Sequence, residues 1–310
     1  MSSMQEQPSS AGGERDAVAH AAARHNARIG AAFAVGAISV WGFIPLLYAV
    51  LVVVPPPEVL SHRVLWSLGI ALTLCFVQDR GKLLRGYLTN RRALLLLAAT
   101  AALIAGNWLG FIFAVNRGEV LQASLGYFIS PLFSVLLGIV LLREHLTWPQ
   151  RIAVLLAVAG VVTHTVAFGE LPWIALILAI TFALYSYLRK IAHPPALEGL
   201  AIEVGWLAPF AIAYLLWQPS SAFGPHAPGL SLALFFAGVT TALPLVWFTA
   251  GARRLRLATI GILQFLSPSI QFVLAITVFG EPFAFADMIT FACIWAAVGL
   301  YIWPRAKAVA

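Results

Sequence analysis

Long apolar stretches, separated by short polar segments, make up most of this chain. Each stretch is long enough for a helix to cross a bilayer core of about 30 Å. The pattern predicts ten such helices, over residues 29–54, 58–77, 92–115, 120–142, 150–167, 171–188, 197–217, 229–250, 257–279 and 284–303. The fourth and fifth stretches would read as one long helix if Pro149 did not lie between them. The fold class expected from this pattern is an all-α membrane protein.

The composition agrees with the hydropathy pattern. Of the 310 residues, 61% are hydrophobic and only 10% are charged, which leaves too little polar surface to cover a soluble globule. Residues 1–28 are rich in Ser, Ala, Gly, Arg and His and lack an apolar core, so they predict a disordered tail rather than a signal peptide. Residues 304–310 predict a short C-terminal tail. Cys75 and Cys293 lie inside predicted spans with no metal-binding spacing, so we expect buried thiols and neither metal nor cofactor.

The distribution of cations predicts the orientation in the membrane. The net charge of +7 alone is also compatible with binding to nucleic acid or to an anionic surface. However, 17 of the 19 Lys and Arg residues fall in the two tails and in every second gap between the predicted helices, and only Arg63 and Arg117 fall toward the other side. Because positive charge in short loops stays inside, both termini are expected in the cytoplasm of a bacterial-type inner membrane, and no nucleic-acid partner is expected.

One apolar phrase occurs twice in the chain. "ISPLFSVLLGIVLLRE" covers residues 129–144 and "LSPSIQFVLAITVFGE" covers residues 266–281, so that their prolines and their terminal glutamates, Glu144 and Glu281, lie 137 residues apart. The same spacing joins Phe111 with Phe248, Phe128 with Phe265 and Ser130 with Ser267. The copies are the fourth and ninth spans, so they cross the membrane in opposite senses.

This repeat predicts two inverted five-helix halves, residues 29–167 and 171–303, with Glu144 at the cytoplasmic face and Glu281 at the outer face. Two such halves can exchange conformations and so open a central site to either side in turn. The alternative is a duplication that produced only a stable bundle.

Five segments in order resemble one protein family: "SHRVLWS" (61–67), "GNWLGFIFAVN" (106–116), "ASLGYFISP" (123–131), "TALPLVWFTAGARRLRLATIGILQFLSP" (241–268) and "FGEP" (279–282). They are similar to the RarD-type permeases of the EamA family, within the drug/metabolite transporter superfamily. The resemblance covers roughly residues 30 to 303. It implies ten helices in two inverted repeats, both termini inside, and export or exchange of small solutes by a secondary mechanism.

Three ionisable residues within the spans are the first candidates for a site. His62, Arg63 and Glu203 lie in predicted hydrocarbon, where a charge usually faces a cavity or a partner. Arg63 and Glu203 lie about two turns into corresponding helices from opposite sides, so we expect them to meet or to be bridged by a solute. The alternatives are a structural ion pair or extension toward the nearer interface. Glu203 and His62 are rival candidates for a proton carrier.

Polar and aromatic residues near mid-membrane complete the predicted site. Asn107, Tyr127 and Gln264 are candidates for solute contact, the last two in the same register of the repeat; hydrogen bonding between helices is the alternative role. Four tryptophans, Trp41, Trp66, Trp206 and Trp295, are placed toward the bundle interior, where the first three could contact a solute and tight packing is the alternative.

No nucleotide-binding or hydrolase motif of the common types is present, which disfavours ATP-driven pumping and catalysis. The function predicted is therefore a secondary-active transporter, most simply an exporter, of a small drug-like, amphipathic or amino-acid-like solute, with protons as a possible second partner. The alternatives are a lipid-carrier flippase on the same fold, whose headgroup site His62 and Arg63 would form, and an intramembrane enzyme. The oligomeric state is left open.

Overall fold

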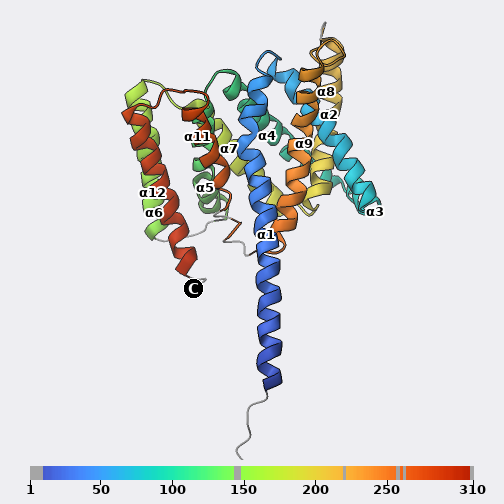
Figure 1. Cartoon of the computed structure of the whole chain (residues 1–310). Helices are drawn as coiled ribbons and strands as arrows, with labels where there is room; N and C mark the ends of the chain where they lie inside the picture. Colours follow the sequence, from blue (N-terminus) through green and yellow to red (C-terminus); the bar gives the residue numbers. More distant parts are fainter. Residues whose placement is uncertain (1–9, 143–147, 219–220, 256–258, 261–262, 308–310) are drawn as a thin grey trace, which may run out of the picture.

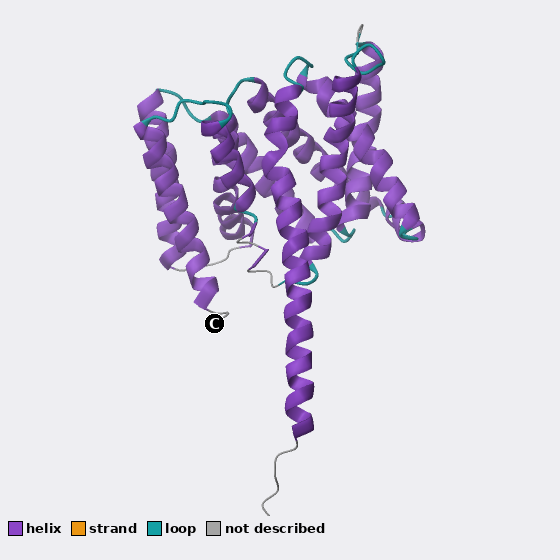
Figure 2. Cartoon of the chain, viewed as in Figure 1, coloured by secondary structure: helices purple, strands orange, loops and turns teal. Residues whose placement is uncertain are grey.

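The fold is a bundle of helices, and the computed structural model describes residues 10–142, 148–218, 221–255, 259–260 and 263–307. Its helices are α1 (Ser10–Val50), α2 (Pro56–Val77), α3 (Gly81–Leu88), α4 (Arg91–Asn116), α5 (Val120–Leu142), α6 (Trp148–Phe168), α7 (Trp173–Ile191), α8 (Ala196–Trp217), α9 (Pro228–Ala252), α11 (Leu266–Thr277) and α12 (Phe285–Lys307). Figure 2 shows that the described residues form helices and loops without strands.

Within the described residues, seven helices are long and apolar enough to cross a membrane, and three shorter apolar helices accompany them. The shorter ones are Val120–Phe133, Leu266–Thr277 and Phe285–Leu300. Many large apolar side chains face outward, such as Val166 on α6 and Phe210 on α8. An outer surface this apolar suits lipid and not water. The chain is therefore a multi-pass membrane protein, as the sequence predicts.

Two segments differ from the predicted elements. α1 begins at Ser10, so residues 10–28 are helical where the sequence predicts a disordered tail. The several alanines of this stretch favour a helix. The helix then runs without a break into the apolar span of α1. The short helix α3 was not predicted at all, because eight residues rich in Lys, Arg and Leu read as a basic loop.

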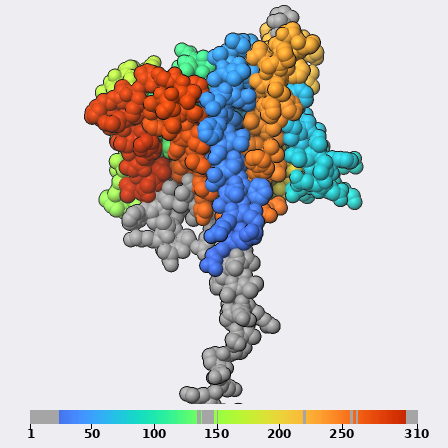
Figure 3. Space-filling model, in the orientation of Figure 1, coloured from blue at the N-terminus to red at the C-terminus, as the bar shows by residue number. Residues whose placement is uncertain are grey.

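The helices pack into one body in which the two described ends of the chain point the same way (Figure 1). α6 and α12 lie side by side at one edge, and α3 projects at the opposite edge. α1 runs along one face between α9 and α11, as Figure 3 shows in space-filling form. The placement of this common end in the cytoplasm stays a prediction.

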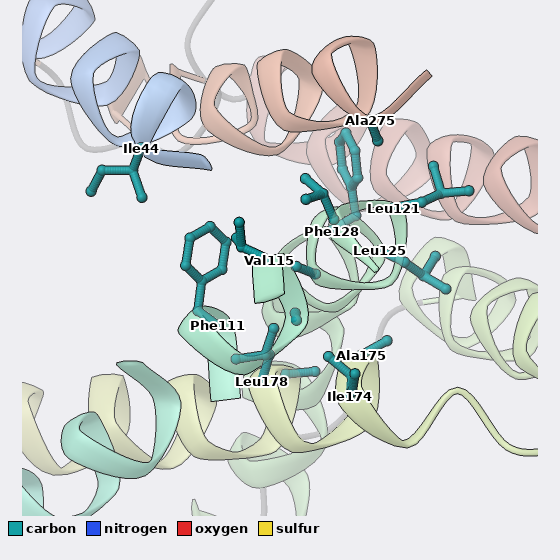
Figure 4. Packing of buried hydrophobic residues seen from close by; sticks show 14 of the residues in the cluster. Ile44, Phe111, Val115, Leu121, Leu125, Phe128, Ile174, Ala175, Leu178 and Ala275 are labelled. Carbon is teal, nitrogen blue, oxygen red and sulfur yellow. The ribbon is translucent and has the colours of Figure 1, made fainter. Parts of the chain in front are cut away.

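The larger hydrophobic core consists mainly of residues in those halves of the helices that lie far from the two chain ends. Side chains from α1, α4, α5, α7 and α11 meet there (Figure 4), among them Ile44, Phe111, Phe128, Leu178 and Ala275. A second cluster joins α2, α4, α8 and α9. Since small residues let helices approach closely, Gly126 brings α5 so near α7 that an added Cβ would lie 2.6 Å from the Ala175 carbonyl oxygen.

Candidate functional site

Arg63 lies at the meeting point of four helices. This α2 residue keeps only 5% of its surface exposed. Its Nε donates to Thr241 Oγ1 of α9 at 2.8 Å, and its Nη1 donates to Tyr48 Oη of α1 at 2.6 Å. The guanidinium carbon lies 4.1 Å from the ring centroid of Trp108 on α4, within cation–π range. We call Arg63, Tyr48, Thr241 and Trp108 the arginine cluster.

An aromatic row leads from the arginine cluster to Asn107. Tyr48 packs edge-on against Phe111, and Phe111 packs against Tyr127, with centroids 6.0 and 5.9 Å apart. Tyr127 Oη donates to Asn107 Oδ1 at 2.9 Å. Asn107 Nδ2 in turn donates to the Leu178 carbonyl oxygen and to Thr181 Oγ1 on α7. Asn107 and Tyr127 are therefore brought together as predicted candidates, and Asn107 also joins α4, α5 and α7.

Glu203 belongs to a separate group, the glutamate cluster of Glu203, Thr100, Tyr185 and Arg189. The carboxylate is 1% exposed and accepts hydrogen bonds from Thr100 Oγ1 at 2.7 Å and from Tyr185 Oη at 3.3 Å. Its ionic partner is Arg189 of α7, whose Nε lies 3.6 Å from Oε1. Its burial is thus offset by one cation and two hydroxyl groups.

The expected meeting of Arg63 and Glu203 is not found among the described residues, where each has other partners. α4 contributes Thr100 to one cluster and Trp108 to the other, eight residues and so about 12 Å apart along the helix. From the sequence, Arg189 was interpreted only as one of the cations that set the orientation in the membrane. Its place in the last turn of α7, joined to α8 by a short turn, was the available signal that it could reach Glu203.

His62 and Trp66 lie on another face of α2, beside the loop between α8 and α9. His62 stacks on Phe223 with centroids 5.0 Å apart, and Trp66 contacts Phe223 and Phe235. Neither His62 Nε2 nor the Trp66 indole nitrogen has a hydrogen-bond partner within the described part of the chain. Trp66 also lines an open, mostly apolar hollow of about 510 Å³ formed with that loop.

The interior placement of the tryptophans is only partly correct. Trp41 is half-buried and packs against Phe248. Trp206 is 42% exposed and faces outward to a large extent. Trp295 is 45% exposed, but one side of its ring packs against Phe128, Phe272 and Phe291. The physical reason is that lipid and protein core are both apolar, so an indole ring can occupy either side of a helix.

Gln264 is also placed differently from its prediction. It is exposed and lies in a turn just before α11 and not inside a continuous helix over 257–279. Pro268 consequently sits in the first turn of α11, where the missing N–H of proline costs least. Gln264 therefore does not reproduce the surroundings of Tyr127.

Of the two terminal glutamates in the repeat, Glu144 lies outside the described residues, whereas Glu281 caps a helix. Glu281 Oε1 accepts from the Val120 amide at 2.6 Å, and Oε2 accepts from the Leu121 amide at 2.8 Å. A carboxylate at this position satisfies the free N–H groups in the first turn of α5. Burial raises the pKa of Glu281, although the two amides oppose that shift.

Comparisons with known proteins agree with this architecture. The EamA-like transporter family matches residues 28–165. "Protein RarD" of Salmonella typhimurium is 42% identical over 278 residues, covering 89% of this chain and 95% of that protein. An "Uncharacterized transporter" of Vibrio cholerae is 41% identical over 281 residues, covering 90% and 93%. A solved crystal structure with 20% identity covers 93% of this chain and 99% of its own with a TM-score of 0.57, which shows a shared fold alone.

Proposed function

Because the chain belongs to the RarD family of EamA-like transporters, we propose that it moves a small solute by alternating access between two inverted halves. The solute is drug-like, amphipathic or amino-acid-like, and the net direction is outward across the cytoplasmic membrane. The observation that carries this proposal is the twofold pattern in the way the helices pack.

The packing pattern repeats when the halves are exchanged. We match α1, α2, α4, α5 and α6 with α7, α8, α9, α11 and α12 in that order. α1 packs against α9 and α11, and its counterpart α7 packs against α4 and α5, which are the counterparts of those two. α2 packs on α8, α5 on α11 and α6 on α12, so matched helices also pair with each other. This is the contact pattern expected of a pseudo-twofold axis in the membrane plane.

Matched residues support the same axis. Phe128 stacks on Phe265, 137 positions later, with centroids 6.2 Å apart and ring planes 12° apart. A residue touches its own counterpart only close to a twofold axis, so this stack favours an axis through the crossing of α5 and α11.

The first turns of α2 and α8 extend the argument. Glu58 and Glu198, 140 positions apart, each bind the segment that follows the other helix. Glu58 accepts from Gln218 Nε2 at 2.6 Å, after α8, and Glu198 pairs with Arg80 at 2.9 Å, after α2. The two ends of the α2 and α8 pair are thus closed in equivalent ways, as an inverted repeat predicts.

Within this framework, the solute site lies between the halves around Arg63, with Tyr127 and Asn107 joined to it by the aromatic row. Trp41 lies about two turns before Tyr48 on α1. Glu203 is the proposed proton carrier, because protonation would weaken its attraction for Arg189. Glu203→Gln is then expected to abolish flux driven by a pH gradient while retaining solute exchange. Equal loss of both activities, or of neither, would contradict this coupling role.

A metabolite-wide export screen of a deletion strain against the complemented strain identifies the solute, and purified protein in liposomes then tests its movement. Recovery of the solute unchanged supports a transporter, whereas a chemically altered solute would indicate an enzyme. Movement of a fluorescent lipid analogue alone would indicate a flippase.

Orientation is tested by cysteine labelling with a membrane-impermeant maleimide on intact cells. Arg117→Cys and Glu170→Cys, both at exposed positions, should react from outside. Lys82→Cys and His193→Cys, at exposed positions near the opposite end, should react only after permeabilisation. The reverse pattern would contradict the proposed topology.

A further inference from the structure

The positive charge of Arg63 has no counter-ion among the described residues. Each partner of its guanidinium group is neutral: the hydroxyl groups of Tyr48 and Thr241 and the ring of Trp108. No carboxylate oxygen of the described chain lies within 4.0 Å of its nitrogens, and Nη2 donates to no group there. An arginine keeps its proton even when buried, so the charge persists in this apolar setting. A buried charge of this kind calls for an anion.

The buried glutamates of α2 and α8 are engaged elsewhere. Glu58, five residues before Arg63, accepts from Gln218 Nε2, from Ser221 Oγ and from the Ala222 amide. Glu198 pairs with Arg80, and Glu203 pairs with Arg189. None of these three carboxylates is therefore free to neutralise Arg63 in this arrangement. The missing anion is best supplied from outside the chain.

We propose that Arg63 binds a carboxylate group of the transported solute, which rests on the proposed transport function. The Nη1–Nη2 edge of the guanidinium group suits a single carboxylate, because Nη1 gives Tyr48 only one of its two N–H groups and Nη2 has no partner within the described chain. Two parallel N–H groups of arginine match carboxylate oxygens in spacing. The hydroxyl groups of Tyr48 and Thr241 fix the plane of the guanidinium group, and Trp108 covers one of its faces.

The surroundings of Arg63 also define the rest of the solute. Trp108 and Tyr48 lie against the guanidinium group, and Phe111 and Tyr127 continue from Tyr48 as a row of ring contacts. Such rings favour a flat or apolar body next to the carboxylate. The solute class is therefore a small organic acid with an apolar or aromatic body. Since Arg63 is only 5% exposed, the acid reaches it when the halves have moved apart.

Binding is tested with matched acid and amide probes, which differ in charge and hardly in shape. Thermal unfolding of the purified full chain is followed with benzoate against benzamide, phenylacetate against phenylacetamide, and phenylalanine against phenylalaninamide. At least one acid should raise the unfolding temperature of the wild-type protein more than its amide does. Arg63→Gln should weaken binding of that acid by about tenfold to a hundredfold and remove the preference for the acid.

Two further variants separate binding from folding. Arg63→Lys keeps the charge but loses the planar fork, so it should retain weakened acid binding. Arg253→Gln removes an exposed arginine at the end of α9 and should bind as the wild type does. Without any ligand, Arg63→Gln should unfold at or above the wild-type temperature, because an unneutralised charge has been removed.

The inference is overturned if no acid stabilises the wild type beyond its amide, if the preference survives Arg63→Gln, or if unliganded Arg63→Gln is markedly less stable. The last result would make Arg63 a structural residue. The transport proposal fails in a different assay, when reconstituted protein that binds the acid moves no solute across the liposome membrane.

Discussion

The pair of Glu203 and Arg189 gives the sharpest test of the packing described here. Glu203 is 1% exposed, and its Oε1 lies 3.6 Å from Arg189 Nε. Removing one partner of a buried ion pair costs about 3–5 kcal/mol, because the other charge is left without compensation. For Glu203→Ala, which also deprives the Tyr185 hydroxyl of its acceptor, we expect the upper part of that range. The unfolding temperature should fall by on the order of 5 to 10 °C.

A double-mutant cycle isolates the interaction between the two side chains. Glu203→Gln keeps the size of the side chain, and Arg189→Met keeps an apolar stem of similar length. If the pair is present, the double variant should be more stable than the sum of the single effects by on the order of 1 to 3 kcal/mol. Unfolding is followed by tryptophan fluorescence of the purified protein in detergent.

The matched control is Lys190→Gln, which removes the neighbouring, exposed cation of α7. It should leave the unfolding temperature nearly unchanged and show no coupling to Glu203→Gln. Additive effects of Glu203→Gln and Arg189→Met would refute the ion pair, and a coupling of Glu203 with Lys190 would refute the described orientation of α7.

Further outcomes at Gly126, Glu281 and Trp206 are expected from the same measurement. Gly126→Val should destabilise the protein by about 1–3 kcal/mol, since its Cβ would collide with the Ala175 backbone, whereas Gly106→Ala, with open space around it, should not. Glu281→Ala should cost about 1 kcal/mol through loss of the cap on α5. Because burial raises the pKa of Glu281, the stability of wild type relative to Glu281→Gln should be greatest at acidic pH and decline as the pH rises through that raised value; an opposite slope would contradict the burial of this carboxyl. Trp206→Leu should change stability by less than about 1 kcal/mol, and a large loss would mean that the ring is buried after all.

The helices themselves were largely predictable, because a bilayer demands long apolar runs and these leave a strong signal in the sequence. The predicted span 58–77 lies inside α2, and 197–217 matches α8 to within one residue at its start. α3 escaped prediction because a short basic amphipathic helix has no such requirement. The helical start of α1 was not predicted because composition alone distinguishes poorly between a polar helix and a disordered tail.

The partners of the site residues were less predictable than their depth. Arg63 and Glu203 were correctly recognised as buried charges, but depth fixes only one coordinate of a side chain. Their lateral neighbours depend on which helices touch, and Arg189 reaches Glu203 only because α7 and α8 are joined by a tight turn. The side of α8 on which Trp206 lies could not be predicted from the sequence either, because the surroundings of this helix are apolar on both the lipid side and the protein side.

The carboxylate of Glu281 has a consequence for how such a protein is made. It belongs to the second half of the chain, yet it completes the opening turn of a helix that belongs to the first. A gene split between α6 and α7 would therefore yield a first fragment whose α5 frays at its start for want of an acceptor. We expect the two fragments to accumulate only when they are synthesised together, because each supplies contacts that the other needs to fold.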